Sequence, residues 1–218
     1  GYYQNSDPLG KGGDFITAPE ISQMFGELLG LWSVICWQQL DSPTTLNLIE
    51  IGPGRGTLMA DGLRAASNLI SFYETLDVHL VETSPVLRKR QQTTLSHIER
   101  PIKWHENFGQ VPDGPFILIA NEFLDVLPIR QFVTTKGLWH ERLIDLTGAG
   151  DALKWTSSRL NCGDEVHVPP IHREAPENQF YEVCPAAHAI LNAISCAIMA
   201  HKGVALFIDY GYVTQMGL

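Results

Sequence analysis

Residues 50–56, EIGPGRG, place three glycines at alternate positions behind an acidic residue, directly after an apolar run. Glycine-rich turns that follow a strand receive small ligands, because a residue without a side chain lets the backbone approach the ligand closely. Dinucleotides, nucleotide phosphates and S-adenosyl-L-methionine all use such turns. The spacing and the neighbouring residues therefore have to decide which ligand this turn suits.

The spacing disfavours a phosphorylated ligand. A dinucleotide fingerprint, G-x-G-x-x-G, that begins at Gly52 and Gly54 requires a third glycine at position 57, where the chain has Thr57. A P-loop requires a Gly-Lys-Ser/Thr ending, and this turn contains no lysine. Pro53 also removes one backbone N–H from the donors that a pyrophosphate would use.

A sulfonium nucleoside suits the turn better. S-adenosyl-L-methionine carries a positive sulfur, an amino group and two ribose hydroxyls, so carboxylates and glycine backbone match it. Glu50 precedes Gly52, Gly54 and Gly56, and Glu82 ends the next predicted strand, where its carboxylate can accept both ribose hydroxyls. Two alternatives remain, since a dinucleotide site places an acid similarly and the turn could join strand to helix without any ligand.

The apolar periodicity predicts the elements that position these residues. Strands are expected at 46–51, 77–82, 102–105, 116–120 and 203–210, and helices at 18–40, 57–68, 85–97 and 185–199. Thr17 and Glu20 have capping-box spacing at the start of the first helix. Alternating strands and helices predict an α/β fold with a parallel sheet, whose ligands bind at the C-terminal strand ends. Residues 129–180 change to an antiparallel pattern with a turn at Lys136 and Gly137.

Five segments resemble one family over essentially the whole chain. They are GDFITAPEISQMFGE (13–27), EIGPGRGTL (50–58), VETSPVLRKRQ (81–91), NEFLDVLPIRQF (121–132) and ALFIDYG (205–211). Together they are similar to the class I protein arginine methyltransferase family that assists mitochondrial complex I assembly, with its bacterial relatives. The resemblance implies methyl transfer from S-adenosyl-L-methionine to an arginine of a partner protein, a complex I subunit in eukaryotic members.

The resemblance also implies an organisation. The expected fold is a Rossmann-like methyltransferase sheet with an antiparallel insert between the fourth and fifth core strands. Residues 1–218 would form a single domain, incomplete at both ends because family members are longer and the chain opens without Met. Its parts are an N-terminal cover and long helix at 1–43, a cofactor-binding half at 44–128, the insert at 129–180, and a final helix and strand at 181–218.

The acids after the fourth strand are the catalytic candidates. A guanidinium stays protonated and has no free lone pair, so carboxylates must hold and polarise it. Glu122 is the first candidate and Asp125 the second, with Asn121 beside the cofactor. The alternative for both acids is a helix N-terminus, where the macrodipole favours negative charge. Asp209 and Tyr210, at the end of the last strand, either contact the substrate or form a hydrogen-bonded core pair.

Two further pairs of residues are candidates for the cofactor. The resemblance places Asp14 and Thr17 in a segment that folds over the cofactor, although Thr17 also fits a plain capping box. Asn107 and Phe108 follow the third strand and could meet the adenine by a hydrogen bond and a ring contact. Ordinary loop packing is the alternative for this second pair.

Composition restricts the partners and the compartment. A net charge of -9 argues against a general affinity for nucleic acid or an anionic membrane, and no apolar stretch is long enough to span a bilayer. Four scattered cysteines favour a reduced compartment, the bacterial cytoplasm or the mitochondrial matrix, and the eight histidines show no metal-binding pattern. The oligomeric state stays open. A non-catalytic cofactor-binding scaffold and an NAD-dependent dehydrogenase are the two alternative functions.

Overall fold

The computed structural model describes residues 19, 22–148, 150, 152–160 and 176–211. The chain divides into two compact units. The first comprises Gly1–Val126 and Ile190–Leu218, and the second Leu127–Ala189. In the described residues, the first unit contains a five-stranded sheet and the second a four-stranded one. The expected α/β class with a mostly parallel sheet is confirmed.

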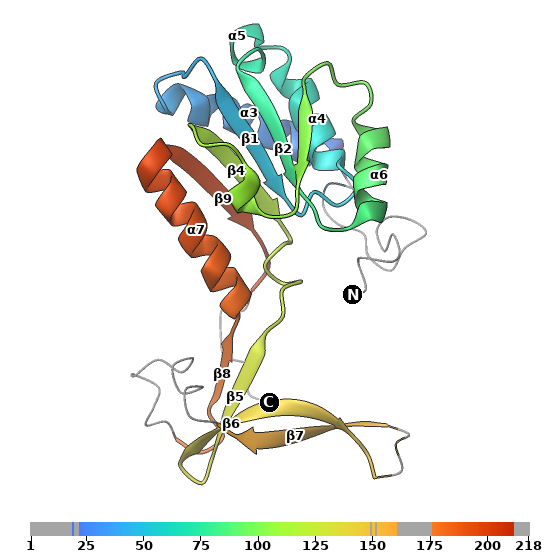
Figure 1. Ribbon diagram of the computed structural model, residues 1–218, viewed down its shortest axis with the longest axis vertical. Coiled ribbons are helices and arrows are strands. Elements are labelled where there is room, and N and C mark those ends of the chain that lie inside the picture. Colours follow the sequence, from blue (N-terminus) through green and yellow to red (C-terminus); the bar gives the residue numbers. More distant parts are fainter. Residues whose placement is uncertain (1–18, 20–21, 149, 151, 161–175, 212–218) are drawn as a thin grey trace. The chain divides into compact units, whose positions relative to one another are not determined.

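The sheet of the first unit is parallel throughout (Figure 1). Its strands are β1 (Leu46–Ile51), β2 (Leu76–Val81), β3 (Ile102–His105), β4 (Phe116–Asn121) and β9 (Gly203–Ile208), in the order β3-β2-β1-β4-β9. The chain builds outward from β1 to one side through β2 and β3, and then to the other through β4 and β9. The switch point therefore lies between the C-terminal ends of β1 and β4, where ligands bind in such sheets.

Helices cover both faces of this sheet, which explains why β1 is buried along its whole length (Figure 1). Alternate residues of a strand point to opposite faces. Leu46 and Leu48 accordingly pack in one hydrophobic cluster with residues of α4 (Thr57–Ala66), whereas Ile49 and Ile51 pack in another with residues of α7 (Pro185–His201). The apolar runs of β1 and β4 thus reflect burial on two sides.

Helix α3 (Gln23–Gln39) packs against α4 through glycines. A Cβ atom at Gly30 would collide with the backbone of Gly62, so the two helices cross at a distance that only glycine allows. The described helix begins after its N-cap residue Ser22. The predicted start at residue 18 and the capping box of Thr17 and Glu20 lie outside the described residues.

The other predicted elements of the first unit are present with shorter ends. Helix α6 covers Pro85–Thr94 and α4 stops at Ala66, while the short helices α5 (Ile70–Tyr73) and η1 (Phe108–Gln110) were not predicted. The last strand was expected to reach residue 210, which is wrong, because β9 ends at Ile208. Its ladder partner there is Asn121, the final residue of β4, so no backbone remains for β9 to pair with.

The second unit contains the antiparallel strands β5 (Arg130–Thr135), β6 (Leu138–Leu146), β7 (Leu153–Arg159) and β8 (Phe180–Val183), in the order β7-β6-β5-β8. The predicted turn is confirmed: Lys136 and Gly137 both have positive φ, 53° and 72°, as a two-residue hairpin turn requires. Phe132 and Val183 are the buried centre of its hydrophobic cluster.

Candidate functional site

The glycine turn leaves β1 at the switch point and adopts left-handed backbone at all three glycines. Gly52, Gly54 and Gly56 have φ of 68°, 51° and 82°. A Cβ atom at Gly52 would lie 3.0 Å from Cδ2 of Phe123, in the segment after β4. The turn that follows β1 and the segment that follows β4 are therefore in direct contact.

Glu50 carries an unsatisfied carboxyl group at the base of this turn. Its side chain is buried, and burial raises its pKa to about 8. Atom Oε2 has no hydrogen-bond partner among the described residues. A buried polar atom without a partner costs free energy, so its presence needs an explanation such as a ligand or a bound water.

Glu82 follows β2 and is also buried, and this burial raises the pKa of its carboxyl group. Its Oε1 accepts a hydrogen bond from the backbone N–H of Ser84 at 2.8 Å, and its Oε2 accepts one from Nε2 of Gln91 at 3.3 Å. The carboxylate is therefore held in one orientation next to the glycine turn.

Gln91 links the two halves of this arrangement. Its Nε2 also donates to the carbonyl oxygen of Gly54 at 2.8 Å, and its Oε1 accepts from Nε1 of Trp104 at 2.9 Å. Gln91 is fully buried on α6. Sequence reasoning missed it, although it ends the quoted motif at 81–91. The signal in the sequence that could have identified Gln91 was a glutamine on the core-facing side of a short helix.

Arg88 is the first of three consecutive basic residues of α6, at positions 88–90. It is half-buried, and its Nε donates to the carbonyl oxygen of Glu82 at 2.7 Å. Its Nη2 is buried with no partner within the described part of the chain. Lys89 and Arg90 are exposed, so Arg88 alone of the three is directed toward Glu82.

Glu122 lies directly after β4 in a strained conformation. Its φ is 47°, a region that residues with a side chain rarely adopt, and its N–H donates to the carbonyl oxygen of Ile208 at 2.8 Å. Residues 122–127 form bends and a turn, and no helix begins there. The alternative of an acid at a helix N-terminus is therefore wrong for Glu122 and Asp125. Non-glycine residues in this region are found preferentially at functional sites.

Asp209 and Tyr210 brace this segment from the end of β9. Asp209 Oδ2 accepts hydrogen bonds from the N–H groups of Leu124 and Asp125, at 3.0 and 3.2 Å. The Tyr210 hydroxyl donates to Asp125 Oδ2 at 2.5 Å, and this bond raises the pKa of Tyr210 to about 12. Asp125 and Asp209 are thus joined in one network beside Glu122, and Asn121 is the last residue of β4.

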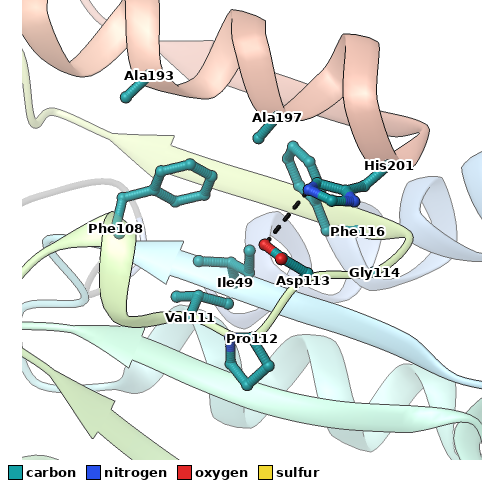
Figure 2. A pocket seen from close by; sticks show the side chains of 11 residues that line it. Ile49, Phe108, Val111, Pro112, Asp113, Gly114, Phe116, Ala193, Ala197 and His201 are labelled. Atoms are coloured by element: carbon teal, nitrogen blue, oxygen red, sulfur yellow. Dashed lines mark ion pairs between the residues drawn. The ribbon is translucent and has the colours of Figure 1, made fainter.

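The remaining predicted residues follow β3 or lie outside the described residues. Asn107 is exposed after β3, and the ring of Phe108 packs edge-on against Phe116, with centroids 5.8 Å apart. Figure 2 shows Phe108 in the wall of a pocket of about 210 Å³ beneath α7, whose rim carries an ion pair between His201 and Asp113. This pocket lies at the start of β4, whereas Glu122 follows its end. Asp14 and Thr17 are outside the described residues.

The described residues contain neither a metal-binding cluster nor a helix suited to span a membrane. They hold no group of three or more histidine, cysteine, aspartate and glutamate side chains placed to bind a metal ion. Among the helices of the same residues, none combines the length and the apolar character that crossing a bilayer requires.

A family model, curated relatives and a solved structure all match this chain. A family model described as "Putative S-adenosyl-L-methionine-dependent methyltransferase" matches residues 28–217. Two curated relatives, both named protein arginine methyltransferase NDUFAF7, mitochondrial, are 37% identical in Xenopus laevis and 38% identical in Homo sapiens. They align with 99% and 97% of this chain. The chain spans about half the length of these relatives, 54% and 52%.

A solved structure is also similar. A protein from Burkholderia thailandensis, crystallised bound to S-adenosyl-homocysteine, superposes with a TM-score of 0.73 at 26% identity. The match covers 94% of this chain and 52% of that one.

Proposed function

This chain belongs to the S-adenosyl-L-methionine-dependent methyltransferase family whose model it matches, and we propose that it transfers methyl groups to an arginine of a partner protein. We propose further that S-adenosyl-L-methionine binds at the glycine turn after β1. The observation that carries this proposal is the contact of Gly52 with Phe123, because it brings a ligand-receiving turn against the acidic segment after β4.

The residues of the turn fit this cofactor. The three left-handed glycines present backbone without side chains, and the unpaired Oε2 of Glu50 can accept a hydrogen bond from a donor of the ligand or from a water beside it. The oriented carboxylate of Glu82 suits a pair of ribose hydroxyls. Asn107 is proposed to meet the adenine, with Phe108 packed on Phe116 to hold the loop. Asp14 and Thr17 remain predicted to belong to a segment that folds over the cofactor.

Glu122 is proposed to grip the target guanidinium, beside Asn121. When bound, the cofactor supplies an electrophilic methyl group. The residues of this chain must hold the arginine nitrogen in line with that group and accept the proton that it loses. The bond to Ile208 fixes the strained backbone of Glu122, and Tyr210 holds the carboxylate of Asp125. We therefore propose that Asp125 either orients the substrate or receives the proton through Tyr210. Glu122 is proposed to contact the guanidinium directly.

We infer that the antiparallel sheet is an insert between the fourth and fifth core strands, as the chain order of β4, β5–β8 and β9 supports. The proposed parts remain 1–43, 44–128, 129–180 and 181–218. We also propose a role in respiratory complex I assembly and, in a eukaryote, a location in the mitochondrial matrix, in line with the names of the mitochondrial relatives. For a bacterial source, a cytoplasmic location stays a prediction.

A binding measurement tests the cofactor. Titration calorimetry of the full-length protein should show binding of S-adenosyl-homocysteine and no response to NAD. Binding of NAD alone would instead favour the dehydrogenase alternative.

A transfer assay tests the chemistry. Full-length protein, labelled cofactor and candidate partner proteins should give label on arginine. Glu122→Gln should lower transfer at least a hundredfold with unchanged S-adenosyl-homocysteine affinity, since a removed transition-state contact is of this order. Glu74→Gln, at an exposed glutamate of α5's C-cap, is the matched control. Cofactor binding without transfer to any candidate would favour the scaffold alternative.

A further inference from the structure

Gln91 is a fully buried polar side chain on α6. One turn earlier, Leu87 fills the same side of this helix with an apolar side chain, so packing alone does not require a glutamine at position 91. A buried amide costs free energy unless its hydrogen-bonding groups are paired. Those of Gln91 are paired with Gly54, Glu82 and Trp104. The reason for this glutamine must therefore lie in the bonds that it makes.

Trp104 determines which way the amide of Gln91 points. An indole N–H can only donate, and that of Trp104 donates to Oε1 of Gln91 at 2.9 Å. The amide nitrogen is thereby directed to the other side, where it donates to the carbonyl oxygen of Gly54 at 2.8 Å and to Oε2 of Glu82 at 3.3 Å. If the amide turned over, its oxygen would face these two acceptors. The direction of the donor is therefore fixed.

Gln91 acts on both the acid and the glycine turn. A carboxylate held through one oxygen can still rotate, whereas one held through both oxygens keeps its plane. In Glu82 the backbone N–H of Ser84 holds Oε1 at 2.8 Å, and Gln91 holds Oε2. The aliphatic part of Gln91 also lies beside Gly56, where a Cβ atom would be 3.4 Å from its Cγ. One side chain therefore sets how the carboxylate is placed relative to the turn.

We propose that Gln91 is a positioning residue that makes cofactor binding depend on the ribose hydroxyls of the ligand. This inference rests on the proposed binding of S-adenosyl-L-methionine at the glycine turn and deepens it. Glu82 accepts from both hydroxyls only while its carboxylate faces them, and the donor on Oε2 keeps it in that orientation. Burial raises the pKa of Glu82 and this donor lowers it, so Gln91 also favours the ionised form, which is the better acceptor.

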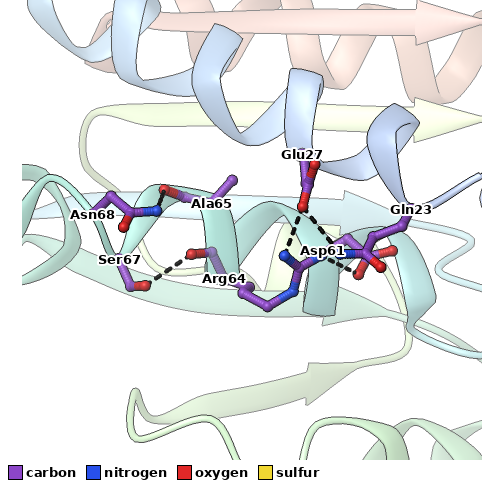
Figure 3. A network of polar contacts seen from close by, with 7 residues as sticks. All are labelled: Gln23, Glu27, Asp61, Arg64, Ala65, Ser67 and Asn68. Carbon is purple, nitrogen blue, oxygen red and sulfur yellow. Dashed lines mark hydrogen bonds and ion pairs between the residues drawn. The ribbon is translucent and has the colours of Figure 1, made fainter.

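A second polar network in the first unit provides a comparison. Figure 3 shows Arg64 of α4 between Glu27 of α3 and Asp61 of its own helix, with N–O distances of 2.6 and 2.9 Å. This network joins two helices, but it includes no residue of the glycine turn and no acid proposed for the ligand. Its loss should therefore change the stability of the first unit without changing how the site distinguishes ligands.

The experiment compares two ligands by titration calorimetry of the full-length protein. They are S-adenosyl-homocysteine and its 2′,3′-dideoxy form, which lacks both ribose hydroxyls. Gln91→Met keeps the length of the side chain and removes the amide. This variant should bind S-adenosyl-homocysteine about tenfold more weakly, the order expected for a lost hydrogen bond to a charged group, and the dideoxy form with much less loss. Gln92→Met, at the exposed neighbouring glutamine, and Arg64→Met are the matched controls and should keep the native ratio of the two affinities.

Trp104→Phe is the milder variant of the same test. It keeps an aromatic ring in place but removes the indole N–H, so the amide of Gln91 is free to turn over. Its ratio of affinities should lie between those of the native protein and Gln91→Met. Circular dichroism and the melting temperature verify that the variants fold, and Trp104→Phe decides the matter if Gln91→Met does not.

Three results would overturn the proposal while leaving the proposed cofactor in place. An equal loss of affinity for both ligands in Gln91→Met means that Gln91 only supports the fold. Unchanged affinities in Gln91→Met and Trp104→Phe mean that Glu82 is held without the amide. Native protein that binds both ligands equally well means that the hydroxyls are not recognised at all. Native protein that binds neither ligand would instead contradict the proposed cofactor itself.

Discussion

The two sheets of this chain differ in how they are stabilised. In the parallel sheet of the first unit, β1 is buried at every position and β4 at all but its last. In the antiparallel sheet of the second unit, β7 is exposed at six of its seven positions and Phe132 is the one fully buried large side chain of its cluster. Parallel sheets are covered on both faces, whereas antiparallel ones can face water. The candidate site therefore stands on a dry, densely packed frame, while the second unit depends on very few buried residues.

The largest expected effect is a loss of stability that is confined to the second unit. Phe132→Ala should destabilise the second unit by about 3–5 kcal/mol, because it leaves a cavity at the centre of the smallest cluster. Hydrogen exchange followed by mass spectrometry should show lost protection in β5 and β8 with unchanged protection in β1 and β4. Equal loss in both sheets would mean that the units unfold together, and the contrast between them would not hold.

Glu50→Gln tests the unusual polar group inside the dry frame. Its carboxyl has a pKa of about 8 in the fold against 4.5 as its ordinary value, so the protonated form is favoured in the folded protein. The stability that the protonated carboxyl contributes to the fold is complete below pH 4.5 and is lost as pH rises through 8. Between pH 5 and pH 9, the free energy of unfolding of the glutamine variant should therefore rise by about 2–4 kcal/mol relative to that of the native chain.

Urea unfolding at the two pH values measures this difference, and calorimetry should show weaker S-adenosyl-homocysteine binding by the same variant. Equal stability differences at both pH values would show that Glu50 is not held protonated.

Gly52→Ala tests whether the turn depends on glycine geometry. Its φ of 68° and the 3.0 Å approach to Phe123 both oppose a side chain, so the substitution should cost about 1–3 kcal/mol and lower cofactor affinity. Gly148→Ala is the matched control, since a Cβ there meets nothing within 4 Å. Thermal unfolding of both variants decides the matter; similar melting temperatures would count against a strained turn.

The smallest expected effect concerns a buried histidine in the first unit. His79 Nε2 donates to Oδ1 of Asn47 at 3.1 Å, so in the neutral ring Nδ1 accepts from Nε2 of His105 at 2.9 Å. Burial lowers the pKa of His79 to about 4. A lowered histidine pKa means that stability is complete above pH 6.5 and falls as pH drops through 4. Between pH 7 and pH 5, the free energy of unfolding should therefore fall by about 1 kcal/mol less in His79→Gln than in the native chain. Urea midpoints at the two pH values measure it, and a slope unchanged by the substitution would contradict the assignment.

Much of the fold could be predicted because its signals are local. The runs at 46–51 and 116–120 could be recognised as strands because strands buried on both faces show no alternation of polar residues. The hairpin turn at Lys136 and Gly137 could be recognised because such a turn needs left-handed backbone, which glycine adopts easily. Contacts across the sheet were not predictable in this way. Gln91 reaches both Gly54 and Glu82 from a helix whose rotation depends on packing, and Asp209 holds the segment after β4 only because β9 lies beside it.

The sequence by itself determined the order and type of the elements, the glycine turn after the first strand and the acids that follow the fourth. These features depend on neighbouring residues and on the period of the side chains. Only the tertiary structure decided that Glu50 has an oxygen without a partner, that Glu122 is strained, and that Met24, Leu28, Leu31 and Ile35 face outward. Burial and strain at a residue are set by segments distant in the chain, so no pattern within one segment contains them.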